Sequence, residues 1–159
     1  MLNLEFEVEG EKHLHRRLER IPASMNNWMG TFSGVGNYLT DFFSGKVFNT
    51  EGGAIGEPWA ALSPKTVEQK QRQGYPKKPL VRTGRMRKSF QSTATPKSVV
   101  VFNTTDYFKY HQSNKPRQKL PRRVMMKLDE MRRQIIVKKF HDEFMRRLNK
   151  TQGSKNIYG

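Results

Sequence analysis

Cysteine is absent from this chain of 159 residues, so a disulfide framework and thiolate-bound metals are excluded. No run of about 18 apolar residues occurs either, and we expect no membrane-spanning helix. The segment Met1 to Glu5 is too acidic and too poor in apolar residues for a secretory signal. Hydrophobic residues make up only 35% of the chain, which predicts a modest core and large surfaces that face solvent or partners.

Acidic residues are scarce in the second part of the chain. Residues 1–63 hold 5 basic and 8 acidic residues, a net charge of −3, whereas residues 64–159 hold 25 basic and 6 acidic residues, a net charge of +19. Such a charge favours nucleic acid or an acidic protein surface as a partner. A basic surface without any specific partner would have the same composition.

Recognisable catalytic patterns are absent as well. The four histidines lack the spacing of a metal site, and neither a Gly-x-Ser-x-Gly sequence nor a phosphate-binding glycine motif occurs. Ser89, Asp106 and His111 could be combined into a nucleophile–acid–base set, but any chain of this length offers such a trio. A metal-dependent nuclease needs clustered carboxylates, which are scarce after residue 63. We therefore predict that the chain is not an enzyme and holds neither a metal nor a cofactor.

Two periodic patterns are present in the N-terminal third. Apolar and polar residues alternate over residues 2–8, which predicts a half-buried strand. An apolar stripe at helical spacing runs from Leu14 to Phe43 and predicts a long amphipathic helix with a kink or restart at Pro22. The helix contains three glycines, Gly30, Gly34 and Gly36. They indicate either close packing against another backbone or simple weak points in the helix.

Short elements separated by turns follow. Ser63 and Pro64 predict a helix start, and this helix should end before Gly74. Thr83 is expected to cap a second, short helix that extends through Phe90. Three further elements are expected from composition and turn residues: a β-hairpin of residues 91–95 and 98–103, a short helical or turn segment over 106–112, and a basic loop over 113–123.

A C-terminal helix is predicted over residues 128–148, but its apolar residues fall on two nearly opposite faces. One face holds Leu128, Met131 and Ile135. The other holds Val137, Phe140, Phe144 and Leu148. Either the helix breaks near Ile136, or it buries both faces, in which case the second face is a candidate inter-subunit contact.

Together these elements predict an α+β fold. A long amphipathic N-terminal helix and a C-terminal helix would pack on a small antiparallel sheet, with extended loops between the elements. Residues 1–150 are expected to form a single domain, and residues 151–159 a flexible C-terminal tail.

Basic residues gather around Thr83 and Gly84, in the loop over 113–123, and along the C-terminal helix. No helix-turn-helix, zinc-finger or RNA-binding motif organises them, so any DNA contact should involve phosphates without sequence readout. The charges on the helix are best interpreted as a solvated face. The candidates for contact with DNA or a neighbouring ring are the cations of the loop, Lys115, Arg117, Lys119, Arg122 and Arg123.

Five short motifs occur in a fixed order over roughly residues 47–128. They are the Gly56 to Thr66 segment followed by Lys70, the Leu80 to Ser89 segment, the strand Val99 to Phe102, the Tyr107 to Gln112 segment, and Pro121-Arg122. In this order and spacing the chain resembles the phage virion morphogenesis family, the tail-completion proteins of Mu-like and related tailed phages. The residues that carry the resemblance are Trp59, Leu62, Thr66, Lys70, Leu80, Thr83, Gly84, Ser89, Tyr107, His111, Gln112, Pro121 and Arg122.

The resemblance implies a structural virion protein that forms a ring, expected to be a hexamer, at the head–tail junction. The ring would be assembled in the host cytoplasm and would join the tail to the DNA-filled head. Its neighbours would be neck proteins and a tail-tube or tail-terminator protein, and double-stranded DNA would pass through its lumen. Two alternatives remain open: a tail-terminator or head-closure ring protein, and a stand-alone nucleic-acid-binding protein without sequence preference.

Overall fold

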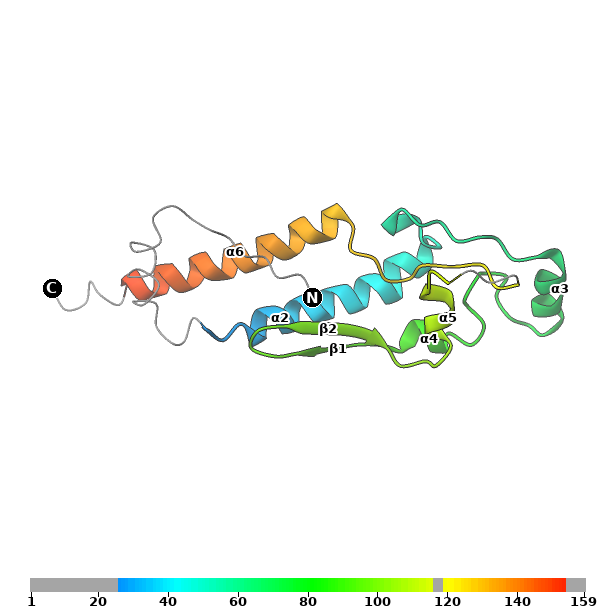
Figure 1. The fold of residues 1–159 in the computed structure, drawn as a ribbon, viewed down its shortest axis with the longest axis horizontal. Helices are drawn as coiled ribbons and strands as arrows, with labels where there is room; N and C mark the ends of the chain where they lie inside the picture. Colours follow the sequence, from blue (N-terminus) through cyan, green and yellow to red (C-terminus); the bar gives the residue numbers. More distant parts are fainter. Residues whose placement is uncertain (1–25, 116–118, 154–159) are drawn as a thin grey trace.

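The computed structural model describes residues 26–115 and 119–153. Helix α2 (Met29–Asp41) is the central element. A two-stranded antiparallel sheet of β1 (Phe90–Ala94) and β2 (Val99–Asn103) lies along one side of it, and the long helix α6 (Glu130–Gly153) runs along another (Figure 1). This arrangement confirms the predicted α+β class. The predicted strand over 2–8 and the helical stripe before residue 26 lie outside the described residues.

The end of α2 continues directly into a π-helical turn, η2 (Phe42–Val47). A π-helix repeats at i, i+5 rather than i, i+4, so Phe42 and Val47 share one face, as do Phe43 and Phe48. All four side chains are buried. The wider turn therefore lets two adjacent pairs of apolar residues enter the core together. The helix extends four residues beyond the predicted end at Phe43, and Met29, assigned to the apolar stripe, is 49% exposed.

The β-hairpin is confirmed. Phe90 pairs with Asn103 at one end and Ala94 with Val99 at the other. Pro96 and Lys97 form the turn, where proline is favoured at the first central position. The hydroxyl of Thr95 accepts a hydrogen bond from the Ser98 amide at 3.0 Å, so a side chain within the turn satisfies this backbone donor.

Contact between α2 and the hairpin depends on one of the three helix glycines. A Cβ atom added at Gly36 would lie 2.7 Å from Ser92 Oγ and 2.9 Å from Val99 Cγ2, closer than real Cβ contacts. Gly30 and Gly34 have nothing within 4 Å of such an atom. Each of the two interpretations therefore holds for different glycines. Gly36 permits close packing, whereas Gly30 and Gly34 only weaken the helix.

An aromatic cluster fills the space where α2, η2 and the hairpin meet. Phe90 contacts three other rings, those of Phe43, Phe48 and Phe108, at centroid distances of 6.3, 6.1 and 5.8 Å. Trp59 completes the cluster edge-on to Phe48 at 5.1 Å. This packing explains why Phe90 belongs to β1 and not to the preceding helix as predicted: its ring is needed in the core, where it is 6% exposed.

Three short helices occupy the end of the molecule away from the hairpin turn (Figure 1). They are α3 (Pro64–Arg72), α4 (Arg85–Lys88) and α5 (Phe108–Gln112). The predicted cap of α3 is confirmed, because Ser63 Oγ accepts a hydrogen bond from the Thr66 amide. The predicted cap of α4 is wrong by one position: Gly84, at φ +77°, is the N-cap residue, and Thr83 Oγ1 accepts only from the Arg85 amide at 3.4 Å.

Helix α6 is continuous, so the predicted alternative of a break near Ile136 is wrong. It also runs to Gly153, past the predicted end at Leu148 and into the segment predicted as a tail. Its inner face against α2 combines apolar and cationic side chains. The Phe140 ring packs on Trp28 and Phe32 at 5.6 and 4.9 Å, and two guanidinium groups lie over aromatic rings, Arg132 over Phe42 at 4.2 Å and Arg147 over Trp28 at 4.5 Å.

Candidate functional site

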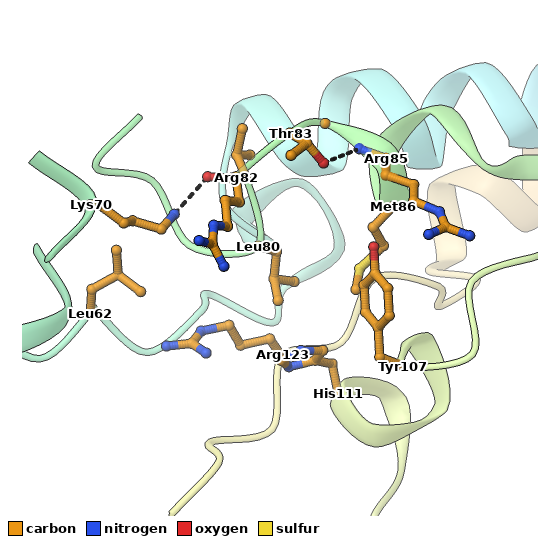
Figure 2. A pocket seen from close by; sticks show the side chains of 12 residues that line it. Leu62, Lys70, Leu80, Arg82, Thr83, Arg85, Met86, Tyr107, His111 and Arg123 are labelled. Atoms are coloured by element: carbon orange, nitrogen blue, oxygen red, sulfur yellow. Dashed lines mark hydrogen bonds between the residues drawn. The ribbon is translucent and has the colours of Figure 1, made fainter. Parts of the chain in front are cut away.

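A cavity of about 400 Å³ opens where the segment before α4 faces α3, α5 and the chain that leads to α6 (Figure 2). We call it the cationic pocket. It is lined by Leu62, Lys70, Leu80, Val81, Arg82, Thr83, Gly84, Arg85, Met86, Tyr107, His111 and Arg123. Many of these residues carried the resemblance in the sequence, so the fold gathers motifs that are far apart along the chain into one concavity.

Lys70 organises one wall of this pocket. Its ammonium donates hydrogen bonds to three carbonyl oxygens of residues 73–84, the connector between α3 and α4: those of Pro76 at 3.1 Å, Lys78 at 2.6 Å and Val81 at 2.6 Å. Burial lowers the pKa of Lys70, and the positive charges of Arg82 and Arg123 lower it further. The side chain therefore fixes the connector while it contributes a positive charge to the pocket.

The connector carries local backbone strain at Leu80, which has φ +56°. A positive φ is an outlier for a bulky residue, and such conformations persist only where surrounding contacts hold them. The Lys70 hydrogen bonds to Lys78 and Val81 grip the chain on both sides of Leu80. The Leu80 side chain is consequently held in the pocket lining.

Arg123 forms the opposite wall and is only 6% exposed. Its Nε and Nη2 atoms donate to the Ala60 carbonyl at 3.0 and 2.8 Å, and Nη2 also reaches Ala61 at 3.3 Å. Burial lowers the pKa of Arg123. Both structural cations, Lys70 and Arg123, are thus satisfied by neutral carbonyl groups, which leave their positive charge uncompensated.

Arg82 and Arg85 add two more exposed cations to the lining. Figure 2 shows the side chains of Lys70, Arg82 and Arg123 around one space beside Leu62 and Leu80, whereas Arg85 lies on the Met86 and Tyr107 side. The Arg82 guanidinium donates to Gln73 Oε1 at 3.1 Å and stacks over the Tyr75 ring at 4.8 Å. Among the described residues that line the pocket, none is acidic.

The other residues of the resemblance tie the scaffold together. The Trp59 indole donates to the Val124 carbonyl at 2.6 Å. The Gln112 carboxamide accepts from the amides of Met125 and Met126 at 2.9 and 3.1 Å and donates to the Met126 carbonyl at 2.7 Å. These bonds bring the Trp59 and Tyr107–Gln112 motifs onto the same segment, 123–126.

The cations predicted to face DNA or a neighbouring ring do not form one group. Lys115, Lys119 and Arg122 are exposed, and Arg117 lies outside the described residues. Arg123 was wrongly grouped with them, because its side chain turns inward to the Ala60 and Ala61 carbonyls. The contact of the exposed members with DNA remains a prediction.

The four candidate inter-subunit residues of α6 also differ in their exposure to solvent. Phe140 packs within the chain on Trp28 and Phe32, and Leu148 is half-buried. Val137 is 66% exposed and Phe144 37% exposed. These two side chains lie seven residues apart, which places them on the same side of the helix. An inter-subunit role remains a prediction for them.

Ser89 supplies the hydroxyl of the trio considered from the sequence. Ser89 Oγ donates its hydrogen bond to the Arg85 carbonyl at 2.7 Å, which directs the hydroxyl into the helix end. Within residues 26–115 and 119–153, no three His, Asp or Glu side chains gather as a metal-ligand set. No described helix is both long and apolar enough to cross a membrane.

Sequence reasoning missed the inward roles of Lys70 and Arg123. One usable signal was present for each. Residues 75–79 of the connector are proline-rich, so their carbonyls require donors from elsewhere. Arg123 stands directly before the apolar run 124–126, which is suited to burial. Lys70 was instead named only as a residue of the family resemblance, and Arg123 as a cation facing DNA or a neighbouring ring.

Comparison with known families places these observations in context. The family model described as the phage virion morphogenesis family matches residues 10–144. The match covers most of the chain, including the whole cationic pocket, and the chain belongs to this family. It is therefore a phage morphogenesis protein with a structural role. No curated protein and no solved structure matches the chain in the corresponding comparisons.

Proposed function

We propose that this protein is a ring-forming neck component that completes the tail and joins it to the DNA-filled head. The observation that carries the proposal is the family match over residues 10–144. The order of the motifs and their convergence on one pocket support it. A structural role of this kind depends on surfaces for assembly, and two surfaces of the chain suit that purpose.

The first surface is on α6. This surface is the edge of that helix beside Phe140: Val137 and Phe144 are exposed there, whereas Phe140 between them packs on Trp28 and Phe32. Apolar side chains on a peripheral helix bury readily against a second copy of the chain. We propose that this face contributes to the contact between neighbouring subunits of the ring.

The second surface is the basic loop. Lys115, Lys119 and Arg122 are exposed on it, and the chain as a whole carries a net charge of +16. Flexible cations next to a DNA path contact phosphates without reading sequence. We propose that these three side chains lie near the lumen or its rim, where they would offset the charge of passing DNA.

Particle size tests the ring directly. Mass photometry at physiological salt should detect a ring, either of the protein alone or on added tail tubes. Val137→Asp and Phe144→Asp should reduce assembly, whereas Met145→Asp, also on α6 and exposed, serves as a matched control. The stand-alone nucleic-acid-binding alternative would be supported instead if the protein stayed monomeric, did not bind tail tubes and bound DNA with a steep salt dependence.

Genetics tests the position in the virion. A phage lysate that lacks this protein should contain filled heads and unattached tails, visible by electron microscopy. Infectious particles in such a lysate would refute the proposal, because a component that joins head to tail is indispensable for infection.

A further inference from the structure

We propose that the cationic pocket binds a peptide segment that carries a carboxylate next to an apolar side chain, supplied by a neighbouring virion protein. That the partner belongs to the virion rests on the function proposed above. The chemistry of the ligand is argued from the pocket alone.

Charge is the first argument. Lys70, Arg82 and Arg123 approach closely enough for the charges of both arginines to lower the pKa of Lys70, and no described lining residue is acidic. Like charges gathered in a partly buried space repel one another, and a bound anion relieves that repulsion. The Arg82 guanidinium has five N–H groups and uses one bond on Gln73, so it can also grip a carboxylate.

Apolar lining is the second argument. Leu62, Leu80 and Met86 line the same cavity as the cations, with the exposed ring of Tyr107 beside them. A free inorganic anion would leave this apolar surface uncovered. A ligand with an aliphatic or aromatic side chain beside its carboxylate would cover it and satisfy the cations at the same time.

Shape distinguishes a peptide from DNA. The phosphates of a duplex lie on a stiff, convex surface, which contacts side chains that project outward. Here Arg123 is 6% exposed and the Lys70 ammonium is already bonded to three carbonyls at the base of a connector. A flexible peptide can enter such a concavity, and arginine-lined pockets are a recurring means of recognising acidic motifs.

The pocket is also built in advance of binding. Leu80 is held at φ +56° by the Lys70 hydrogen bonds on both sides of it. A wall that is fixed before the ligand arrives reduces the ordering that binding requires. Strained backbone of this kind is concentrated at ligand sites, which is consistent with a binding role for the connector.

Fluorescence anisotropy with labelled peptides tests the inference on the full chain at about 0.15 M salt. The probe is Gly-Ser-Leu-Asp-Leu-Glu-Gly-Ser. One matched peptide carries Asn and Gln in place of the acids, and another carries Ser in place of both leucines. We expect the probe to bind. Each matched peptide should bind at least about tenfold more weakly than the probe, because each loses one of the two kinds of contact.

Protein variants locate the binding. Arg82→Gln should weaken probe binding about tenfold, as expected for a lost charge-assisted hydrogen bond. Arg133→Gln removes the same charge from an exposed position on α6 and should have no effect. Leu62→Ser should weaken binding of the probe but not of the serine-substituted peptide. Because Arg82 is exposed, the variant should fold, and circular dichroism verifies this.

Two results would overturn the inference. Equal losses for Arg82→Gln and Arg133→Gln would assign binding to the general positive charge. The second result concerns a 20-base-pair DNA duplex. If Arg82→Gln weakens binding of the duplex but not of the probe, and Arg133→Gln weakens neither, the pocket would be assigned to DNA. Neither result depends on the lysate experiment, so the pocket inference and the proposed function can fail separately.

Discussion

The side chain of Gln112 pairs with the backbone of Met126 as one strand pairs with another. Its carboxamide oxygen accepts from the Met126 amide at 3.1 Å, and its nitrogen donates to the Met126 carbonyl at 2.7 Å. The same oxygen accepts from the Met125 amide at 2.9 Å. One residue of α5 thus fixes the segment that delivers Arg123 to the cationic pocket and leads on to α6.

Gln112→Glu tests this pairing. A carboxylate can still accept from the two amides, but its second oxygen would face the Met126 carbonyl without a proton between them. We expect the free energy of unfolding at pH 7 to fall by about 1–3 kcal/mol, measured by urea denaturation. Acidification should recover part of the loss, because the protonated acid again donates. Gln69→Glu, at an exposed position of α3, is the control.

Trp59→Phe tests the hydrogen bond between the Trp59 indole and the neighbouring residue Val124. The substitution keeps an aromatic ring against Phe48 but removes the indole N–H that bonds to the Val124 carbonyl at 2.6 Å. A buried carbonyl without its donor costs about 1–3 kcal/mol, and the lost ring volume adds to this. Urea denaturation should show that destabilisation. Wild-type stability in the variant would mean that the hydrogen bond contributes little.

Paired glycine substitutions on α2 separate helix propensity from packing. Gly34→Ala should stabilise the protein by up to about 1 kcal/mol, because alanine is the better helix former and open space surrounds the position. Gly36→Ala should destabilise it, because the new methyl group would lie 2.8 Å from Ser92 Cβ and 2.9 Å from Val99 Cγ2. Thermal melts of both variants measure the difference. Equal stabilisation at the two positions would contradict the close approach of the hairpin.

Local signals explain which elements could be predicted from the sequence. The hairpin turn at Pro96-Lys97 and the Ser63 cap are determined by residues within a few positions of each other, and both are confirmed. The π-turn that buries Phe42 and Val47 is set by packing against the rest of the core, and helical periodicity does not reveal it.

Tertiary partners explain what could not be predicted. The inner face of α6 uses Arg132 over the ring of Phe42 and Arg147 over the ring of Trp28, so a search for apolar spacing misidentifies that face. The pocket presents the same difficulty. The sequence displays the charges of Lys70 and Arg123, but the carbonyl groups that hold them come from segments placed by the fold. The prediction therefore mistook Arg123, a buried cation, for an exposed one, and did not foresee that the Lys70 ammonium turns to the connector.

Acid sensitivity should arise where α6 meets the start of α2. Hydrogen bonds from Arg146 and Arg147 lower the pKa of Glu143 to about 2, against an ordinary value of 4.5. Arg147 also donates to the Asn27 carbonyl at 2.8 Å and stacks over Trp28. Because the folded-state pKa is depressed, the stabilisation is fully present above pH 4.5 and is lost as the pH falls from 4.5 towards 2.

Glu143→Gln should therefore destabilise the protein at pH 7 and have progressively less effect below pH 4.5. Urea denaturation at a series of pH values measures this, and salt should reduce the effect because Arg146 is well exposed. The control is the same substitution in a protein that carries Arg146→Ala and Arg147→Ala, where the depressed pKa has lost its cause. A destabilisation that is equal at pH 7 and pH 3, or unchanged in the control background, would contradict the role of these two arginines.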